Sequence, residues 1–137
     1  MSGQIHEGGC FCGAVRYRTN GEPKRVSLCS CTWCRKRTGS PLGLSVYFDI
    51  AGVDFLSGET KSFRLTSDAG RWLETRFCVI CATTVGWTLE FLPGHQGIAG
   101  GTFDEPDQWT PHRYVFCAAK PDWLGVCESI PRFTAMP

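Results

Sequence analysis

The segment 29–39 reads CSCTWCRKRTG and places three cysteines, Cys29, Cys31 and Cys34, close together. We call these three residues the triplet. A structural zinc site normally has four protein ligands, whereas a catalytic zinc has three and leaves one position for water or substrate. Three neighbouring thiols therefore indicate either an open metal site or a closed site completed by a fourth ligand from elsewhere in the chain. A cationic run, 35–37, follows them directly.

Four further cysteines form two pairs, Cys10 with Cys12 as C-x-C and Cys78 with Cys81 as C-x-x-C. Residues i and i+2 of a strand face the same side, so C-x-C directs two sulfurs at one ion. A tight turn does the same for C-x-x-C. Seven clustered sulfurs divide most naturally into a structural site with four ligands and a second site with three.

Spacing alone leaves the grouping of these sulfurs open. Cys78 and Cys81 could share an ion with part of the triplet. The triplet could also be completed to four ligands by Cys117 or Cys127, or belong to a shared cluster. The simplest interpretation of Cys117 and Cys127 is that both are small buried hydrophobic residues.

Length and composition predict one globular domain over residues 1–137. Apolar residues make up 42% of the chain and charged residues 20%, which is ordinary for a folded protein. The 14 Lys and Arg nearly balance the 13 Asp and Glu, so no basic surface for nucleic acid or an anionic membrane is expected. The N-terminal segment lacks a signal-peptide pattern, and no apolar run is long enough to span a membrane. We therefore expect a cytoplasmic protein, where nine cysteines indicate metal binding or catalysis in preference to disulfides.

Hydrophobic periodicity predicts an all-β fold. Apolar and polar residues alternate in the segments 14–19, 42–50, 61–67, 83–91 and 113–119, and turn-forming residues separate them. Short helical turns are expected only after Cys34 and near Asp107, and GHQGIAGG at 94–101 is interpreted as a turn-rich connection. The prediction is a compact, irregular, sandwich-like β fold stapled by zinc, with little helix.

Four segments carry a resemblance to a known family: GGCFCGAVRY, LCSCTWCRKRTGSP, RFCVIC and PHRYVFCAAKPDW. In this order they resemble the glutathione-dependent formaldehyde-activating enzymes, a family that also includes centromere-protein-V-like domains. The resemblance extends from about Gly8 to Trp123. It implies an irregular β fold with two zinc ions. The implied structural ligands are Cys10, Cys12, Cys78 and Cys81, and the implied catalytic-site ligands are Cys29, Cys31 and Cys34.

Two positions depart from the family pattern. Family members usually continue the last cysteine pair with glycine, whereas this chain has Ala82, so alanine must make a turn that favours glycine. Ser30 occupies a position where members often carry histidine, so no proton-transfer role is expected there.

The resemblance implies a zinc-dependent carbon–sulfur lyase that joins glutathione and formaldehyde to S-hydroxymethylglutathione, or acts on a related thiol–aldehyde adduct. Arg35 and Arg37 are the expected contacts of the thiol's carboxylates, since arginine binds carboxylates in a bidentate manner. The alternative for this cationic run is a solvated surface.

Two other functions compete with the lyase. One is a non-catalytic, zinc-stabilised module that binds a partner, as the centromere-protein-like members suggest. The other is a redox sensor that releases zinc when its thiolates are oxidised. The isolated histidines, His6, His95 and His112, are expected to be surface or packing residues. Trp33 either lines the pocket beside the triplet or packs against the metal-binding turn.

Overall fold

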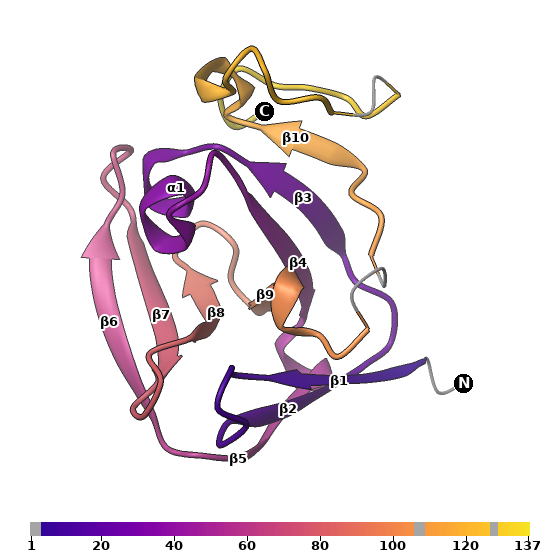
Figure 1. Cartoon of the computed structure of the whole chain (residues 1–137), viewed down its shortest axis with the longest axis vertical. Coiled ribbons are helices and arrows are strands. Elements are labelled where there is room, and N and C mark those ends of the chain that lie inside the picture. The colour runs from indigo at the N-terminus through magenta and orange to yellow at the C-terminus, as the bar shows by residue number, and fades with distance from the viewer. Residues whose placement is uncertain (1–3, 106–108, 127–128) are drawn as a thin grey trace.

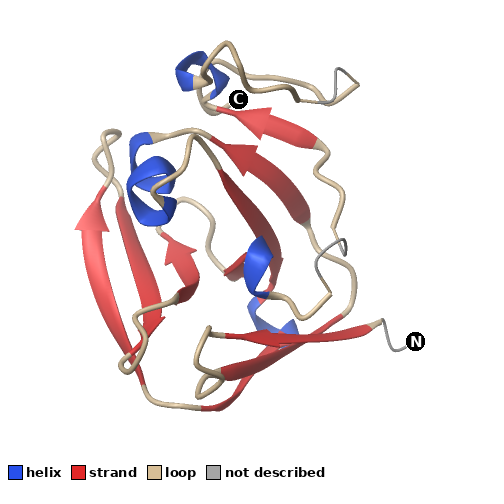
Figure 2. Ribbon diagram, viewed as in Figure 1, coloured by secondary structure: helices blue, strands red, loops and turns tan. Residues whose placement is uncertain are grey.

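The computed structural model describes residues 4–105, 109–126 and 129–137. Within these residues the chain forms ten strands in two sheets, one short α-helix and three 3-10 helices (Figure 1; Figure 2). The helical turn expected near Asp107 and the position of Cys127 lie outside the described residues. The expectation of an all-β fold with little helix is confirmed. None of the described helices is long and apolar enough to cross a lipid bilayer.

The larger sheet has seven strands. In spatial order they are β10 (Arg113–Val115), β3 (Arg25–Cys29), β4 (Gly43–Asp49), β9 (His95–Ala99), β8 (Thr84–Leu89), β7 (Trp72–Cys78) and β6 (Thr60–Thr66). All neighbours are antiparallel except β10 and β3, which run parallel.

The smaller sheet has three antiparallel strands and lies below the larger one in Figure 1. Its strands are β1 (Ile5–Gly9), β2 (Arg16–Asn20) and β5 (Val53–Ser57). The 3-10 helices η1 (Ile50–Gly52), η2 (Gly100–Thr102) and η3 (Cys117–Ala119) follow β4, β9 and β10.

The main hydrophobic core joins the two sheets. Val46 and Ile98 are register partners in the larger sheet, and both are fully buried. Tyr17 of β2 is equally buried and belongs to the same cluster. Burying an apolar side chain of this size contributes about 1.5–3 kcal/mol. The residues 46 and 48 of the predicted alternating segment therefore face the core as expected, whereas Ile50 is half exposed in η1, because β4 ends at Asp49.

The opposite face of the larger sheet is built largely from small residues. Cys29 pairs with Gly43 on β4, and Ser27 pairs with Ser45. The helix α1 (Thr32–Thr38) packs against β4 on this side. A Cβ at Gly43 would lie 2.6 Å from Arg37 Nη2, so glycine leaves the space that the Arg37 guanidinium occupies. The small side chains thus allow the helix with its cationic run to approach the sheet.

The segment 94–101 is a central strand and not a turn-rich connection, so that interpretation was wrong. β9 lies between β4 and β8, and Gly97 pairs with Trp87. A Cβ at Gly97 would lie only 2.5 Å from Trp87 Nε1. Glycine is present here because the indole ring packs directly on the strand backbone, which is a known reason for glycine inside a strand.

A bulge changes the side-chain pattern predicted for residues 83–91. The register of β7 and β8 shifts between Arg76 and Phe77, so Val85 is an extra residue on β8. Val85 consequently packs in the main core, whereas Trp87 contacts Trp33 on the opposite side of the sheet. A shift by one residue reverses the face on which a side chain lies.

The chain after β10 folds back along that strand. Phe116 adopts a left-handed conformation with φ of 54°, which ends the strand predicted for 113–119. Tyr114 N donates to Pro131 O and Phe133 N donates to Tyr114 O, each at 2.8 Å. These bonds hold the segment 131–133 beside β10, in the upper part of Figure 1.

Candidate metal centres

Two hairpin loops bring four sulfurs together. Cys10 and Cys12 lie between β1 and β2, Cys78 is the last residue of β7, and Cys81 lies in the turn before β8. The Sγ atoms of Cys10 and Cys12 are 3.6 Å apart, those of Cys12 and Cys78 are 3.8 Å apart, and all four lie within 4.8 Å of one another. Zinc–sulfur distances of about 2.3 Å give a tetrahedron with edges of about 3.8 Å. We call these residues the four-sulfur cluster; its donor set and spacing fit a tetrahedral zinc.

Hydrogen bonds to sulfur prepare this cluster for the thiolate form. Val15 N donates to Cys10 Sγ at 3.2 Å, and Ile80 N donates to Cys78 Sγ at 3.3 Å. The hydroxyl of Thr83 and its backbone lower the pKa of Cys81 to about 5. Such contacts around a ligand orient it and stabilise its charged form.

Ala82 makes the turn that glycine usually makes in the family. Its φ is 65°, in the left-handed region, and Ala82 N donates to Cys78 O at 2.9 Å. The expectation of a strained alanine turn after Cys81 is therefore confirmed.

The triplet lies at the junction of β3 and α1. Cys29 ends the strand, Cys31 is the N-cap of the helix, and Cys34 lies within it. Their three Sγ atoms are within 4.8 Å of one another. Cys31 N donates to Cys29 Sγ and Cys34 N donates to Cys31 Sγ, both at 3.4 Å. The sulfurs therefore converge on one point with backbone N–H groups directed at two of them.

The three thiols share their protons unequally. Hydrogen bonds from Cys29 and Cys34, together with backbone N–H groups, lower the pKa of Cys31 to about 3. The same contact with Cys31 raises the pKa of Cys29 to about 12, and contacts with both neighbours raise the pKa of Cys34. These contacts favour the thiolate form at Cys31 over the thiolate forms of Cys29 and Cys34.

Within the described part of the chain, no fourth His, Cys, Asp or Glu joins the triplet. Cys117 in η3 is outside the group, which argues against a closed site completed by that residue. The two clusters are also separate. The β1–β2 loop and the β7–β8 turn lie low in Figure 1, whereas the β3–α1 junction lies high. The sulfurs are therefore grouped as four and three, without sharing.

Apolar side chains surround the triplet. Cys29 and Cys34 are buried in a cluster with Val115, and Phe116 and Phe133 pack against it. The left-handed conformation of Phe116 is costly for a residue with a side chain. The chain after β10 thus forms one wall of the site, which no sequence motif indicated.

The cations predicted to bind substrate take different positions. Arg35 Nε donates to Ser30 O at 3.1 Å and so supports the loop between Cys29 and Cys31. The guanidinium carbon of Arg37 lies over two indole rings. It is 4.5 Å from the ring centre of Trp87 and 5.1 Å from the ring centre of Trp33. The Nε and Nη2 atoms of Arg37 are buried without a hydrogen-bond partner. Arg37 therefore retains unused donors beside the triplet, and Trp33 helps to hold it.

Two tyrosines missed by sequence reasoning also belong to this region. The hydroxyl of Tyr114 bonds to Ser30 Oγ, and both residues are fully buried. Ser30 thus faces away from its cysteine neighbours. Trp87 Nε1 donates to the Tyr47 hydroxyl oxygen at 3.0 Å. Burial raises the pKa of Tyr47.

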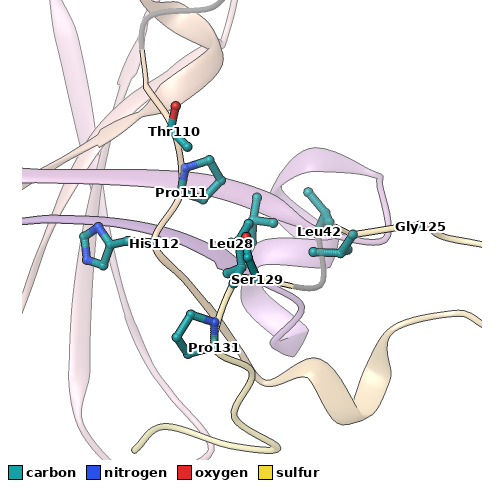
Figure 3. A pocket seen from close by; sticks show the side chains of 10 residues that line it. Leu28, Leu42, Thr110, Pro111, His112, Gly125, Ser129 and Pro131 are labelled. Carbon is teal, nitrogen blue, oxygen red and sulfur yellow. The ribbon is translucent and has the colours of Figure 1, made fainter.

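The histidines lie away from both clusters. His6 packs edge-on against Trp109, and His95 Nδ1 is 3.0 Å from Pro93 O. His112 lines a cavity of about 630 Å3 between Leu28 and residues 125–126 and 129–131 (Figure 3).

A second cavity, of about 510 Å3, is lined by Arg35 and Lys36 on one side and Ala119 and Pro121 on the other. The triplet lines neither this cavity nor the one beside His112.

Comparisons with known proteins agree with this architecture. Residues 5–119 match the family model described as glutathione-dependent formaldehyde-activating enzyme. A crystal structure of a Rhodobacter sphaeroides protein is similar, with a TM-score of 0.60 and 17% sequence identity, over 74% of this chain and 91% of that one. That similarity concerns the fold. No curated protein matches the sequence. Since the family model covers most of the chain, the protein belongs to the glutathione-dependent formaldehyde-activating enzyme family.

Proposed function

We propose that the protein is a zinc-dependent carbon–sulfur lyase that forms or cleaves a thiol–aldehyde adduct such as S-hydroxymethylglutathione. The observation that supports this most directly is a convergent set of three thiols, with no fourth ligand among the described residues, in a chain of this family. In this proposal Cys29, Cys31 and Cys34 hold a catalytic zinc. The four-sulfur cluster holds a structural zinc.

The reaction involves no change of oxidation state. The sulfur of the thiol forms a bond to the carbonyl carbon, the π electrons of the carbonyl move to its oxygen, and the thiol proton ends on that oxygen. Zinc at the triplet would supply a fourth coordination position that favours the deprotonated form of the substrate thiol. Three thiolates leave a formal charge of −1 there, which favours thiol activation over polarisation of the aldehyde.

In this proposal Arg37 acts on the bound substrate. Its two buried donors lack partners, and the charge of a guanidinium is permanent. We propose that Arg37 contacts a substrate carboxylate or the oxygen of the adduct. Arg35 supports the loop of the triplet and, with Lys36, lines the adjacent cavity, where a second anionic group of the thiol would be attracted.

Tyr47 is a candidate proton donor to the adduct oxygen. The indole N–H of Trp87 occupies its oxygen, so its own hydrogen is available elsewhere. Its raised pKa keeps the hydroxyl protonated at neutral pH. Tyr47→Phe should therefore lower the rate of adduct formation and leave zinc binding unchanged.

Exchange NMR on glutathione and formaldehyde tests the proposed activity. The zinc-loaded protein should accelerate adduct formation and cleavage above the spontaneous rate, and Cys34→Ser should abolish the acceleration. Cys117→Ser is the matched control, because it removes a thiol outside both clusters. No acceleration with both clusters filled would refute the lyase with these substrates.

One observation favours the alternative of a partner-binding module. Phe11 is 94% exposed and Ile80 is 73% exposed, and each lies between two cysteines of the four-sulfur cluster. Exposed apolar side chains on a rigid turn suit a protein interface. If the lyase activity fails, Phe11→Ser combined with Ile80→Ser should abolish partner capture and leave the zinc content unchanged.

A further inference from the structure

Arg25 and Arg113, near the triplet, are among the arginines that form no ion pair with another described residue. Arg16, Arg18 and Arg64 each form an ion pair with a carboxylate. Among the described residues, no carboxylate lies within ion-pair distance of Arg25 or Arg113.

The strand register places Arg25 and Arg113 on the face that carries the triplet. Val115 is the register partner of Cys29, and Arg113 is the partner of Ser27. Arg25 precedes Ser27 by two residues and therefore shares its side of the sheet. A step of two residues along a strand is about 6.6 Å. The two arginines thus lie on the same face of the larger sheet as the triplet, further along the strands.

Short side chains lie beside Arg113. In the row between the triplet and Arg25, Arg113 pairs with Ser27, and Ser27 pairs with Ser45. The next row pairs Arg25 with Tyr47. The acidic residue beyond it, Asp49, forms its ion pair with Lys24. The face therefore presents positive charge without its own counter-ion.

The contacts of the Arg113 side chain compensate its charge poorly. Its Nε atom is buried and has no hydrogen-bond partner. Its Nη2 atom is 3.6 Å from Met136 Sδ, and its guanidinium lies 5.8 Å from the centre of the Phe133 ring. Burial lowers the pKa of Arg113, and the nearby charge of Arg25 lowers it further. Two like charges, one of them with a buried and unsatisfied donor, are unfavourable unless an anion is present.

We propose that Arg113 and Arg25 bind a carboxylate of the thiol substrate. This inference rests on the proposed function, because it assumes that the substrate's sulfur lies at the triplet. In glutathione one residue, glycine, separates the cysteine from a terminal carboxylate, and a residue spans about 3.5 Å. A thiol at the triplet therefore reaches the arginines with that carboxylate. The substrate class is a cysteinyl peptide with a free C-terminal carboxylate, in preference to an uncharged thiol.

The test uses S-methylglutathione, in which the thiol is blocked and both carboxylates are free, and its diethyl ester, in which both are blocked. Calorimetric titration compares the wild type with Arg113→Gln. The matched control is Arg71→Gln, which removes an arginine packed on Phe91 at the β6–β7 turn. Arg113→Gln should weaken binding of S-methylglutathione about tenfold or more, as expected when a charged hydrogen bond is lost. Arg71→Gln should leave it unchanged.

Two further measurements distinguish a binding role from a structural one. Arg113→Gln should retain the zinc content and should not lower the melting temperature, because it removes an unpaired charge. Arg113→Lys should restore part of the affinity. If Arg113→Gln does not fold, Arg25→Gln provides the same comparison. Equal affinity of the wild type and both glutamine variants would overturn the proposal, as would equal binding of the acid and its ester.

The outcomes separate this site from the lyase reaction. Arginine-dependent binding without acceleration of adduct formation would support the carboxylate site and refute the reaction. Acceleration that is unaffected in Arg113→Gln, with unchanged affinity, would support the reaction and refute the carboxylate site. Failure of S-methylglutathione to bind the wild type would also refute it.

Discussion

The two cysteine clusters have the same donor atoms but differ in how the chain brings them together. The four-sulfur cluster joins Cys10 and Cys12 to residues 78 and 81, and it lies at the edge of the main core, with Cys12 exposed. The triplet spans only residues 29–34 and lies in a second, smaller apolar cluster. Metal at the first cluster would cross-link two hairpins, whereas metal at the second would bridge one turn of chain. In our proposal the same donor atoms therefore serve the fold in one place and the reaction in the other.

Support of the sulfurs by backbone N–H groups does not explain this difference, since both clusters have it. Val15 and Ile80 donate to the first cluster, and Cys31 and Cys34 donate within the second. The difference lies in the number of converging sulfurs and in the sequence distance between them.

The largest expected effect is on folding. Cys78→Ser should give unfolded or insoluble protein, because metal binding in small zinc domains contributes on the order of 10 kcal/mol. Cys34→Ser should give a folded protein with less zinc and no activity. Circular dichroism and thermal melting compare the folding of the two variants, and metal analysis compares their zinc content. The reverse pattern would show that the roles of the two clusters are exchanged.

Metal removal should proceed in two steps. A chelator should take zinc first from the triplet, which has fewer ligands, and later from the four-sulfur cluster together with loss of the fold. Release followed by a zinc-binding dye should be biphasic in the wild type, and Cys117→Ser should leave both phases unchanged. Folded protein without metal would contradict both assignments. Iron in place of zinc would change only the identity of the metal.

A smaller effect should follow from removing the buried hydrogen bond between Tyr114 and Ser30. Tyr114→Phe leaves the Ser30 hydroxyl buried without its partner, which should cost about 1–2 kcal/mol of unfolding free energy. It should also speed zinc release from the triplet, since Ser30 lies between two of its members. Chemical denaturation of both single variants and of Tyr114→Phe with Ser30→Ala measures the coupling. Strict additivity would mean that the bond contributes nothing.

The smallest effects compare two left-handed residues with the same φ of 65°, one near each cluster. Ala82→Gly should stabilise the four-sulfur turn, and Gly39→Ala should destabilise the end of α1, each by about 0.5–1 kcal/mol. A Cβ at Gly39 meets no atom within 4 Å, so only backbone strain changes there. Urea denaturation measures both. Changes of the same sign would show that contacts, and not the left-handed conformation, dominate.

Local patterns predicted much of the fold. The alternation in 42–50 corresponds to β4 (Gly43–Asp49), and the cysteine spacing predicted a division of sulfurs into four and three. Both signals are local, because a strand face and a C-x-x-C turn depend on adjacent residues. Spacing could not decide which distant pairs meet, since that depends on how the two hairpins pack.

Other features depend on contacts that a sequence does not display. In the sequence Gly97 is typical of a turn, but in the structure it lies in a strand, where the indole of Trp87 packs against it. Val85 faces the core only because of a bulge. The cationic run 35–37 was expected to bind substrate carboxylates or to be a solvated surface, yet the guanidinium of Arg37 lies over the rings of two tryptophans. Arg25 and Arg113 are 88 positions apart in the sequence, and only the parallel pairing of β10 with β3 places them on one face.

The segment that folds back along β10 affects how the protein behaves at high concentration. β10 is the outermost strand of the larger sheet, and the free backbone groups of such a strand can pair with another molecule. Here Pro131 and Phe133 bond to both backbone groups of Tyr114. They thereby protect the sheet from edge-to-edge aggregation. A chain shortened before Pro131 would expose this strand, and we expect it to self-associate even with both metal clusters filled.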